Sequence, residues 1–275
     1  MEADPARSQR FLTMTSLFGR FIDSTVGSRF FLEAFTQLGT FAGAISGVRM
    51  ASVKHFDWFG AYVIGFITAL GGGTLRDVLL GVTPFWMEDP SYLVTTFLAV
   101  LAVALFGRRF ISEQITWFIF DTISISIFMV IGMEKVWLVK GTPIVEAGGS
   151  FGVPEAMGLW WLAITMGVIT AVFGGVMRDI CINDVPLIFR KEIYALACAA
   201  GGFVHLALLK AGVDGRICGV VCMATIFAIR ALAIKYHLGV PVLTGRRAIR
   251  THFRVHPRQP AREPATMKKE EGQKE

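Results

Sequence analysis

Most of this sequence consists of apolar stretches that are each long enough to cross a lipid bilayer. Crossing about 30 Å of hydrocarbon takes on the order of 20 apolar residues, and such a segment must be helical because its backbone groups find no water to bond. The stretches are Phe30 to Ser52, Trp58 to Leu80, Ser91 to Phe106, Ile115 to Met133, Leu159 to Cys181, Glu192 to Leu209 and Arg216 to Ala233. They predict an all-α integral membrane protein with seven transmembrane helices.

The composition agrees with this class of protein and argues against several others. Hydrophobic residues make up 53% of the chain and charged residues only 17%, and the mean hydropathy is +0.56. Most of the net charge of +6 lies in the C-terminal tail and in short loops, so nucleic acid is not an expected partner. No Ser-His-Asp order, His-Glu-x-x-His pattern or phosphate loop indicates an enzyme. The four cysteines lack partners at metal-ligand spacing, so we expect no metal, disulfide or cofactor.

One motif occurs twice within the apolar stretches. It reads GGGTLRD from Gly71 to Asp77 and GGVMRD from Gly174 to Asp179, and the two Arg-Asp pairs lie 102 residues apart. The same offset pairs Pro84 with Pro186, and Tyr92 with Tyr194. The motifs therefore match the first three stretches with the next three. Because each unit crosses the membrane an odd number of times, the second unit must be inverted, and the seventh helix is an addition.

This repeat divides the chain into five parts. They are an N-terminal polar or interfacial segment (1–29), the first three-helix repeat (30–110), the second repeat (115–210), the seventh helix (216–235) and a basic, disordered tail (236–275). Gly47 and Gly132 correspond at an offset of only 85, so the second repeat carries about 17 extra residues, which we assign to Lys140 to Pro154. Basic residues after the last stretch favour a cytoplasmic C-terminus.

The repeated glycines are the first candidate site. Gly71, Gly72 and Gly73 would each cost about 1 kcal/mol relative to alanine inside a helix, so close packing or an open backbone must compensate. Glycine-interrupted helices at equivalent positions of inverted repeats mark transport sites, and we therefore interpret helices two and five as broken at Gly71 to Gly73 and at Gly174 and Gly175. Broken helix ends could bind a cation on carbonyl oxygens or a carboxylate on amide hydrogens.

Charged residues follow both glycine motifs within one helical turn. Arg76, Asp77, Arg178 and Asp179 are costly at membrane depth unless they are paired or wetted. A functional role and a purely structural pairing both account for them. Our hypothesis is that they form ion pairs that hold the broken helices and restrict an aqueous path.

Other intramembrane polar residues are weaker candidates. Asp121 opens the fourth stretch as a further lining residue, but its counterpart in the first unit is Thr36, so an acidic role there is not shared between the halves. Glu33 lies nearby and could substitute for it. His205 and Arg230 are interpreted as packing or interface residues.

Several longer segments carry a family resemblance. They read LGTFAGAISG from Leu38 to Gly47, ALGGGTLRDVLLG from Ala69 to Gly81, PFW from Pro84 to Trp86, GGVMRD from Gly174 to Asp179, and PLIFRKEIYA from Pro186 to Ala195. The chain resembles the prokaryotic branch of the trimeric intracellular cation (TRIC) channel family, whose tandem domains are also labelled glycine transporter. The resemblance covers roughly residues 30 to 235.

The resemblance implies a homotrimer in membrane lipid, in a bacterial plasma (inner) membrane. Each subunit would hold its own water-filled path between helices two and five, permeable to potassium and other monovalent cations. The pore-kink positions would be Gly71, Gly72, Gly73, Gly174 and Gly175, and the polar lining Arg76, Asp77, Arg178 and Asp179. The chain departs from the family pattern at Thr36, where an Asp is usual. Transport of glycine or another small zwitterion, or a membrane assembly role without transport, are the alternative functions.

Overall fold

The structure is a computed structural model that describes residues 33–111, 114–140, 157–190 and 193–239. All of these residues belong to one compact unit, Met1–Pro241. The expected N-terminal segment, nearly all of the insertion after Lys140, and the basic tail from residue 240 onward lie outside the described residues.

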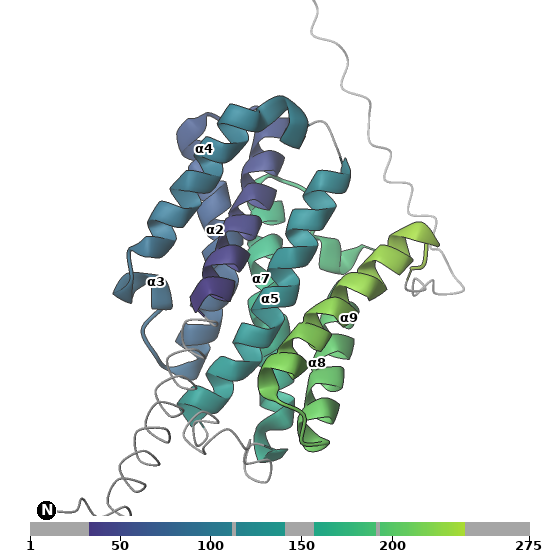
Figure 1. Cartoon of the computed structure of the whole chain (residues 1–275). Helices are drawn as coiled ribbons and strands as arrows, with labels where there is room; N and C mark the ends of the chain where they lie inside the picture. Colours follow the sequence, from purple (N-terminus) through teal and green to yellow (C-terminus); the bar gives the residue numbers. More distant parts are fainter. Residues whose placement is uncertain (1–32, 112–113, 141–156, 191–192, 240–275) are drawn as a thin grey trace, which may run out of the picture. The chain divides into compact units, whose positions relative to one another are not determined.

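The described residues are almost entirely helical, which confirms the all-α class (Figure 1). The long helices are residues 33–53, α2 (Trp58–Leu80), α4 (Ser91–Ile111), α5 (Gln114–Lys140), α7 (Trp160–Cys181), α8 (Ala195–Lys210) and α9 (Gly215–Lys235); the short ones are α3 (Phe85–Glu88), η1 (Met157–Leu159) and η2 (Leu187–Phe189). Each predicted stretch coincides with one long helix. The main difference in bounds is that α4 and α5 both extend further toward their C-terminal ends than predicted.

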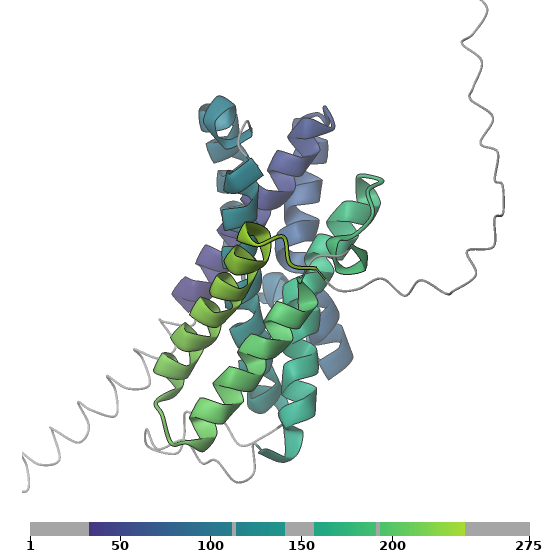
Figure 2. The same cartoon turned by 90° about the vertical axis from the view of Figure 1, so that its right-hand side faces the viewer.

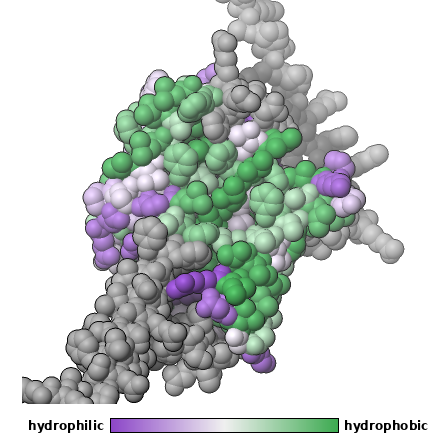
Figure 3. All heavy atoms as spheres, viewed as in Figure 1, coloured by the Kyte–Doolittle hydropathy of each residue, from purple (hydrophilic) through white to green (hydrophobic). Residues whose placement is uncertain are grey.

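Four of these helices are long and apolar enough to cross a membrane: α2, α5, α7 and α9. Residues Ser91–Gly107 of α4 and helix α8 are shorter apolar segments. The membrane crossing of α4, α8 and residues 33–53 therefore stays a prediction. Apolar residues cover much of the face shown in Figure 3, as expected for a surface that meets lipid or another apolar surface.

Local sequence signals set several helix ends. The side chain of Asp57 caps α2 by accepting a hydrogen bond from the amide of Gly60, and Gly81 ends the same helix with a φ of 75°, a conformation that suits glycine. Before α4, the hydroxyl and the amide of Ser91 donate to the Asp89 carboxylate and lower its pKa below the usual value.

Helix α7 lies at the centre of the bundle, where it packs against α2, α5 and α8 (Figures 1 and 2). Helix α9 lies on the outside against α8 and α5. One hydrophobic cluster is formed mainly by residues 33–53, α2 and α4, and a second mainly by α5, α7, α8 and α9. Each predicted three-helix unit thus has its own core, and α9 adds to the core of the second unit.

The two units meet where α2 crosses α7, and the contacts at this crossing are reciprocal. A Cβ on Gly72 would overlap the backbone carbonyl of Thr170, and a Cβ on Gly174 would overlap the backbone carbonyl of Thr68. Thr68 and Gly72 occupy the same positions in the first unit as Thr170 and Gly174 in the second. As the residue number rises along α2 it falls along α7, so the two helices are antiparallel, as an inverted repeat requires.

A second set of contacts repeats within each unit. A Cβ on Gly47 would overlap the side chain of Thr68, and a Cβ on Gly132 would lie 2.6 Å from the Thr170 hydroxyl. Both threonine hydroxyls donate to the carbonyl four residues earlier at 2.6 Å. Residues 33–53 therefore pack on α2 in the same way that α5 packs on α7. The offset of 85 residues inferred from the sequence matches these equivalent positions.

Candidate functional site

The glycine motifs lie in helices that continue through them. Both α2 and α7 are α-helical without interruption across Gly71 to Gly73 and across Gly174 and Gly175. This corrects the expectation that the backbone is unwound at these positions. Gly72 and Gly174 instead remove side chains where the backbones of α2 and α7 touch, whereas Gly73 faces the ring of Phe85 and Gly175 faces Tyr194. Glycine keeps its amide hydrogen and can therefore continue the helical hydrogen bonding. Four of the five are buried, and Gly71 is partly buried.

The first Arg-Asp pair is buried at the C-terminal part of α2. Arg76 bonds Asp77 through Nε and Nη2, each 2.8 Å from Oδ1. The other carboxylate oxygen of Asp77 accepts a hydrogen bond from the Phe85 amide at 3.0 Å. The Arg76 guanidinium also lies 5.7 Å from the centre of the Phe85 ring. Asp77 thus joins its own arginine to the start of α3, beyond the turn that follows the helix.

The second pair has the same geometry in α7. Arg178 Nε lies 2.8 Å from Asp179 Oδ1, and Asp179 Oδ2 accepts a hydrogen bond from the Leu187 amide at 3.2 Å. Leu187 corresponds to Phe85 at the 102-residue offset, so each aspartate receives the amide that follows the proline of its own repeat. The hypothesis of ion pairs is therefore supported, and their visible role is to fix the turn after each helix.

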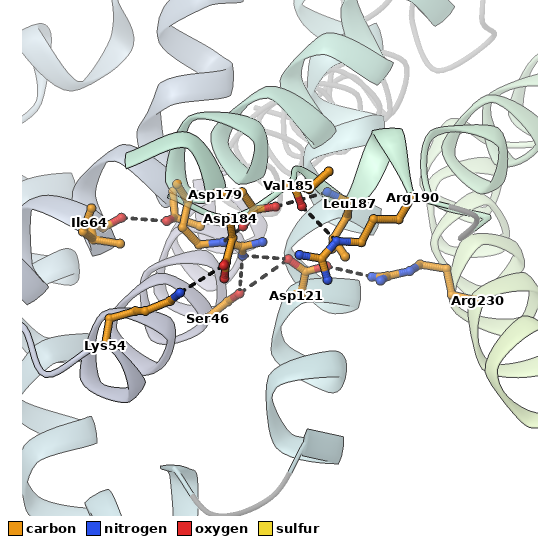
Figure 4. Close-up of polar contacts among 12 residues, drawn as sticks. Ser46, Lys54, Ile64, Asp121, Asp179, Asp184, Val185, Leu187, Arg190 and Arg230 are labelled. Carbon is orange, nitrogen blue, oxygen red and sulfur yellow. Dashed lines mark hydrogen bonds and ion pairs between the residues drawn. The ribbon is translucent and has the colours of Figure 1, made fainter. Parts of the chain in front are cut away.

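Asp121 belongs to a larger network that the first unit lacks. Its Oδ1 lies 3.2 Å from Arg178 Nη1, and its Oδ2 lies 2.8 Å from Arg230 Nη1. Ser46 also accepts a bond from Arg178 at 2.9 Å and lies 3.4 Å from Asp121. Figure 4 shows Asp121 between Ser46 and Arg230, with Asp179 nearby. We call Ser46, Asp121, Arg178, Asp179 and Arg230 the Asp121 network; all five are buried.

The charges of this network balance, which is the condition for placing them in a low-dielectric interior. Two carboxylates face two guanidinium groups, and Arg230 is further held by the rings of Tyr194 and Phe118, at 4.7 and 5.0 Å. Asp121 lies inside α5 rather than at its start. Arg230 is part of the network, contrary to its interpretation as a packing or interface residue. Glu33 is exposed and does not replace Asp121 in the first unit.

A cavity of about 550 Å³ reaches this network from one end of the bundle. Its lining combines Arg49, Asp179, Asp184 and Arg190 with apolar residues of α5 and α9. Arg49 was missed by the sequence interpretation although it is a buried charge within an apolar span. Its counterpart at the 85-residue offset is Glu134. A charged residue at the same position of both repeats could have marked Arg49 as a candidate.

His205 lies apart from the Asp121 network. Its ring stacks on Trp137 with a centroid separation of 6.0 Å, and Nε2 is 3.7 Å from the Glu134 carboxylate. The described residues contain no group of three or more His, Cys, Asp or Glu side chains that could bind a metal ion.

These features define a class: an integral membrane protein made of two inverted repeats with balanced charges buried beside their crossing. The chain belongs to the family described as Glycine transporter, whose family model matches residues 33–108 and 144–210. The UPF0126 inner membrane protein YadS of Escherichia coli is 34% identical over 208 residues, which cover 74% of this chain and 92% of that protein.

Two solved structures share the fold. One, from a study of conductance through TRIC cation channels, is 32% identical with a TM-score of 0.64 and covers 78% of this chain and 98% of that one. The other is the TRIC trimeric intracellular cation channel orthologue from Rhodobacter sphaeroides, which is 29% identical with a TM-score of 0.64 and covers 75% of this chain and 98% of that one.

Proposed function

We propose that this protein is a channel for monovalent cations, potassium among them. The observation that carries the proposal is the similarity, at 29–32% identity and over nearly the whole length of each neighbour, to structures of TRIC cation channels. We further propose that the protein works in a bacterial inner membrane with its C-terminus in the cytoplasm.

We place the cation path inside the subunit, along the interior shared by residues 33–53, α2, α5 and α7. This interior contains buried hydroxyl groups that can replace part of a cation's hydration shell. They belong to Thr40, Ser46, Thr68, Thr122, Ser124, Ser126 and Thr170. The cavity beside Arg49 and Asp179 would be one mouth of the path. Because the α2 and α7 backbones touch at Gly72 and Gly174, this crossing would be the narrowest point, and opening would require the two helices to separate there.

Transport of glycine or another small zwitterion is the second candidate. The name of the matching family model favours it. The cavity lining also carries charges of both signs, Arg49 and Arg190 with Asp179 and Asp184, as the two ends of a zwitterion require. A carrier of this kind would use the same crossing as its closed gate.

Reconstitution of the full-length protein in planar bilayers and liposomes tests both candidates. We expect unitary current steps that reverse near the potassium equilibrium potential in a potassium gradient. Saturable glycine uptake without current steps would favour the carrier, and the absence of both activities would contradict both candidates.

A cysteine experiment tests the position of the path. Cys181 is the one exposed cysteine and is first replaced by alanine. In that background, a positively charged thiol reagent is expected to block current through Gly71→Cys, because Gly71 is partly exposed beside Gly174 at the crossing. Val78→Cys is the control, since Val78 is 60% exposed on the outer face of α2. If current persists after the cysteine in Gly71→Cys has been modified, the path does not pass this crossing. The proposal of channel activity would still stand.

A further inference from the structure

Exposed aromatic side chains begin the middle helix of each three-helix unit. Trp58 and Phe59 are the first two residues of α2 and are 69% and 75% exposed. Trp160 and Trp161 are the first two residues of α7 and are 43% and 55% exposed. The 102-residue offset of the repeats maps one pair onto the other. Both units therefore place two large aromatic rings on the surface at the same position.

The antiparallel crossing of α2 and α7 places the two aromatic pairs at opposite ends of the bundle. Gly72 lies against Thr170 and Gly174 against Thr68, so the paired residue numbers add up to 242 at both contacts. Each step forward along α2 is thus a step backward along α7. The start of each helix therefore lies level with the end of the other helix.

The separation of the two pairs matches the thickness of a bilayer. In the register of the crossing, Trp160 lies level with residue 82, just beyond the C-terminal end of α2. That level is about 24 residues from Trp58, or roughly 36 Å along the helix at about 1.5 Å per residue. The hydrocarbon of a bilayer is about 30 Å thick, and the bilayer with its headgroups is about 40–45 Å thick. The two pairs are therefore spaced to lie in the two headgroup regions.

The chemistry at both positions is that of a membrane interface. Aromatic rings, and tryptophan above all, are enriched there because the ring is apolar while the indole N–H can bond water or headgroups. Exposed basic residues accompany each pair: His55 lies shortly before Trp58, and Lys140 ends α5, which packs antiparallel on α7. None of residues 60–77 of α2 is exposed, so the rings at its start are not part of an apolar stripe along the helix.

We propose that Trp58 with Phe59, and Trp160 with Trp161, are two anchors that contact the phospholipid headgroup regions on opposite surfaces of the membrane. The α2–α7 crossing then lies at the midplane, half way between the anchors. Each Arg-Asp pair lies within about two helical turns of one surface, at the end of its helix away from that helix's own anchor. The inference goes beyond the proposed conduction and does not depend on it, because depth in a bilayer is measured without any current or uptake.

Spin labels measure the depth of both anchors in liposomes of dioleoylphosphatidylcholine that contain the full-length protein. Cys181, the exposed cysteine, is replaced by alanine, and single cysteines are then introduced as Phe59→Cys, Trp161→Cys and Ala224→Cys. Ala224 is the control, since it is exposed near the middle of α9. Collisions of the label with oxygen, which dissolves in hydrocarbon, and with a water-soluble nickel complex report its depth. We expect the labels at both anchors to lie about 15 Å shallower than the control label, which is half the hydrocarbon thickness.

Lysine substitutions provide an independent measurement of the same depths. A lysine near the interface can extend its ammonium group to water, whereas a lysine in the middle of the membrane is costly. Phe59→Lys and Trp161→Lys are therefore expected to leave the yield of folded protein in the membrane nearly unchanged. Ala224→Lys is expected to lower that yield several-fold.

The proposal would be overturned if the label at either anchor lay as deep as the control label, or if neither oxygen nor the nickel complex reached it. The second result would show that another subunit covers the rings. A loss of folded protein in Phe59→Lys or Trp161→Lys as large as in Ala224→Lys would contradict the proposal equally. If a labelled variant does not fold, the lysine variants decide.

Discussion

At the scale of single residues, Asp121 is the side chain on which the buried charges of the second unit depend. It bonds both Arg178 and Arg230, at 3.2 and 2.8 Å. Asp121→Ala would remove the carboxylate that pairs with Arg230 and would leave Arg178 with Asp179 alone. Breaking a buried pair in this way costs about 3–5 kcal/mol. We expect a correspondingly large fall in the free energy of unfolding, measured by reversible denaturation in detergent.

The matched control for this prediction is Asp184→Ala. Asp184 pairs with Lys54 at 3.0 Å, but both side chains are about one third exposed, so the loss is expected to be about 0–1 kcal/mol. Equal effects of the two substitutions would show that the burial of the Asp121 network contributes little to stability.

The sequence predicts part of this network and not the rest. Each Arg-Asp pair consists of chain neighbours and occurs in both repeats, so the sequence alone identifies the pairs as candidates. Asp121 is identifiable because it is a charged residue within an apolar stretch. Ser46 and Arg230 come from helices 75 and 109 residues away from Asp121. Which face of the last helix turns toward Asp121 depends on tertiary packing. Helical periodicity carries no information on that choice when the helix is apolar nearly all round.

At the scale of elements, the glycines determine how closely α2 and α7 approach. Alanine inside a helix is ordinarily favoured over glycine by about 1 kcal/mol. In Gly72→Ala and Gly174→Ala the new methyl group would overlap a carbonyl of the facing helix, and such overpacking costs about 1–3 kcal/mol. We therefore expect both substitutions to lower the melting temperature, the reverse of their effect on an isolated helix.

Gly71→Ala is the control in the same motif. Its Cβ would meet Gly174 Cα at 3.6 Å, an ordinary contact, so helix propensity should make this substitution neutral or stabilising. If all three alanine variants melted alike, the close crossing of α2 and α7 would not be what the glycines provide.

The bounds of the helices followed from the sequence to within a few residues, except at the C-terminal ends of α4 and α5. Capping signals such as Asp57 and Gly81 and the apolar lengths are local, so they can be recognised without the fold. The unwinding of α2 and α7 was wrongly expected because glycines that open a helix and glycines that let two helices touch look the same in a sequence. Only the facing carbonyls of Thr68 and Thr170 distinguish them.

At the scale of the whole molecule, the two inverted units are similar in geometry but differ in charge. The first has Thr36 where the second has Asp121, and the added helix α9 supplies Arg230 only to the second unit. These two differences compensate each other, because the extra carboxylate and the extra guanidinium appear together. The seventh helix therefore completes the electrostatics of the second unit as well as its hydrophobic core.

The outer surface leads to the last prediction, a homotrimer. Large apolar side chains face outward along several helices, with Phe97 58% and Leu105 70% exposed on α4 (compare Figure 3). The solved orthologue from Rhodobacter sphaeroides is described as trimeric, and a contact between subunits would cover part of such a surface. Light scattering in detergent should give a protein mass three times the 30.2 kDa of one chain, after the detergent contribution is subtracted. A mass of one chain would contradict the trimer, yet it would leave the proposed path intact because that path lies within a single subunit.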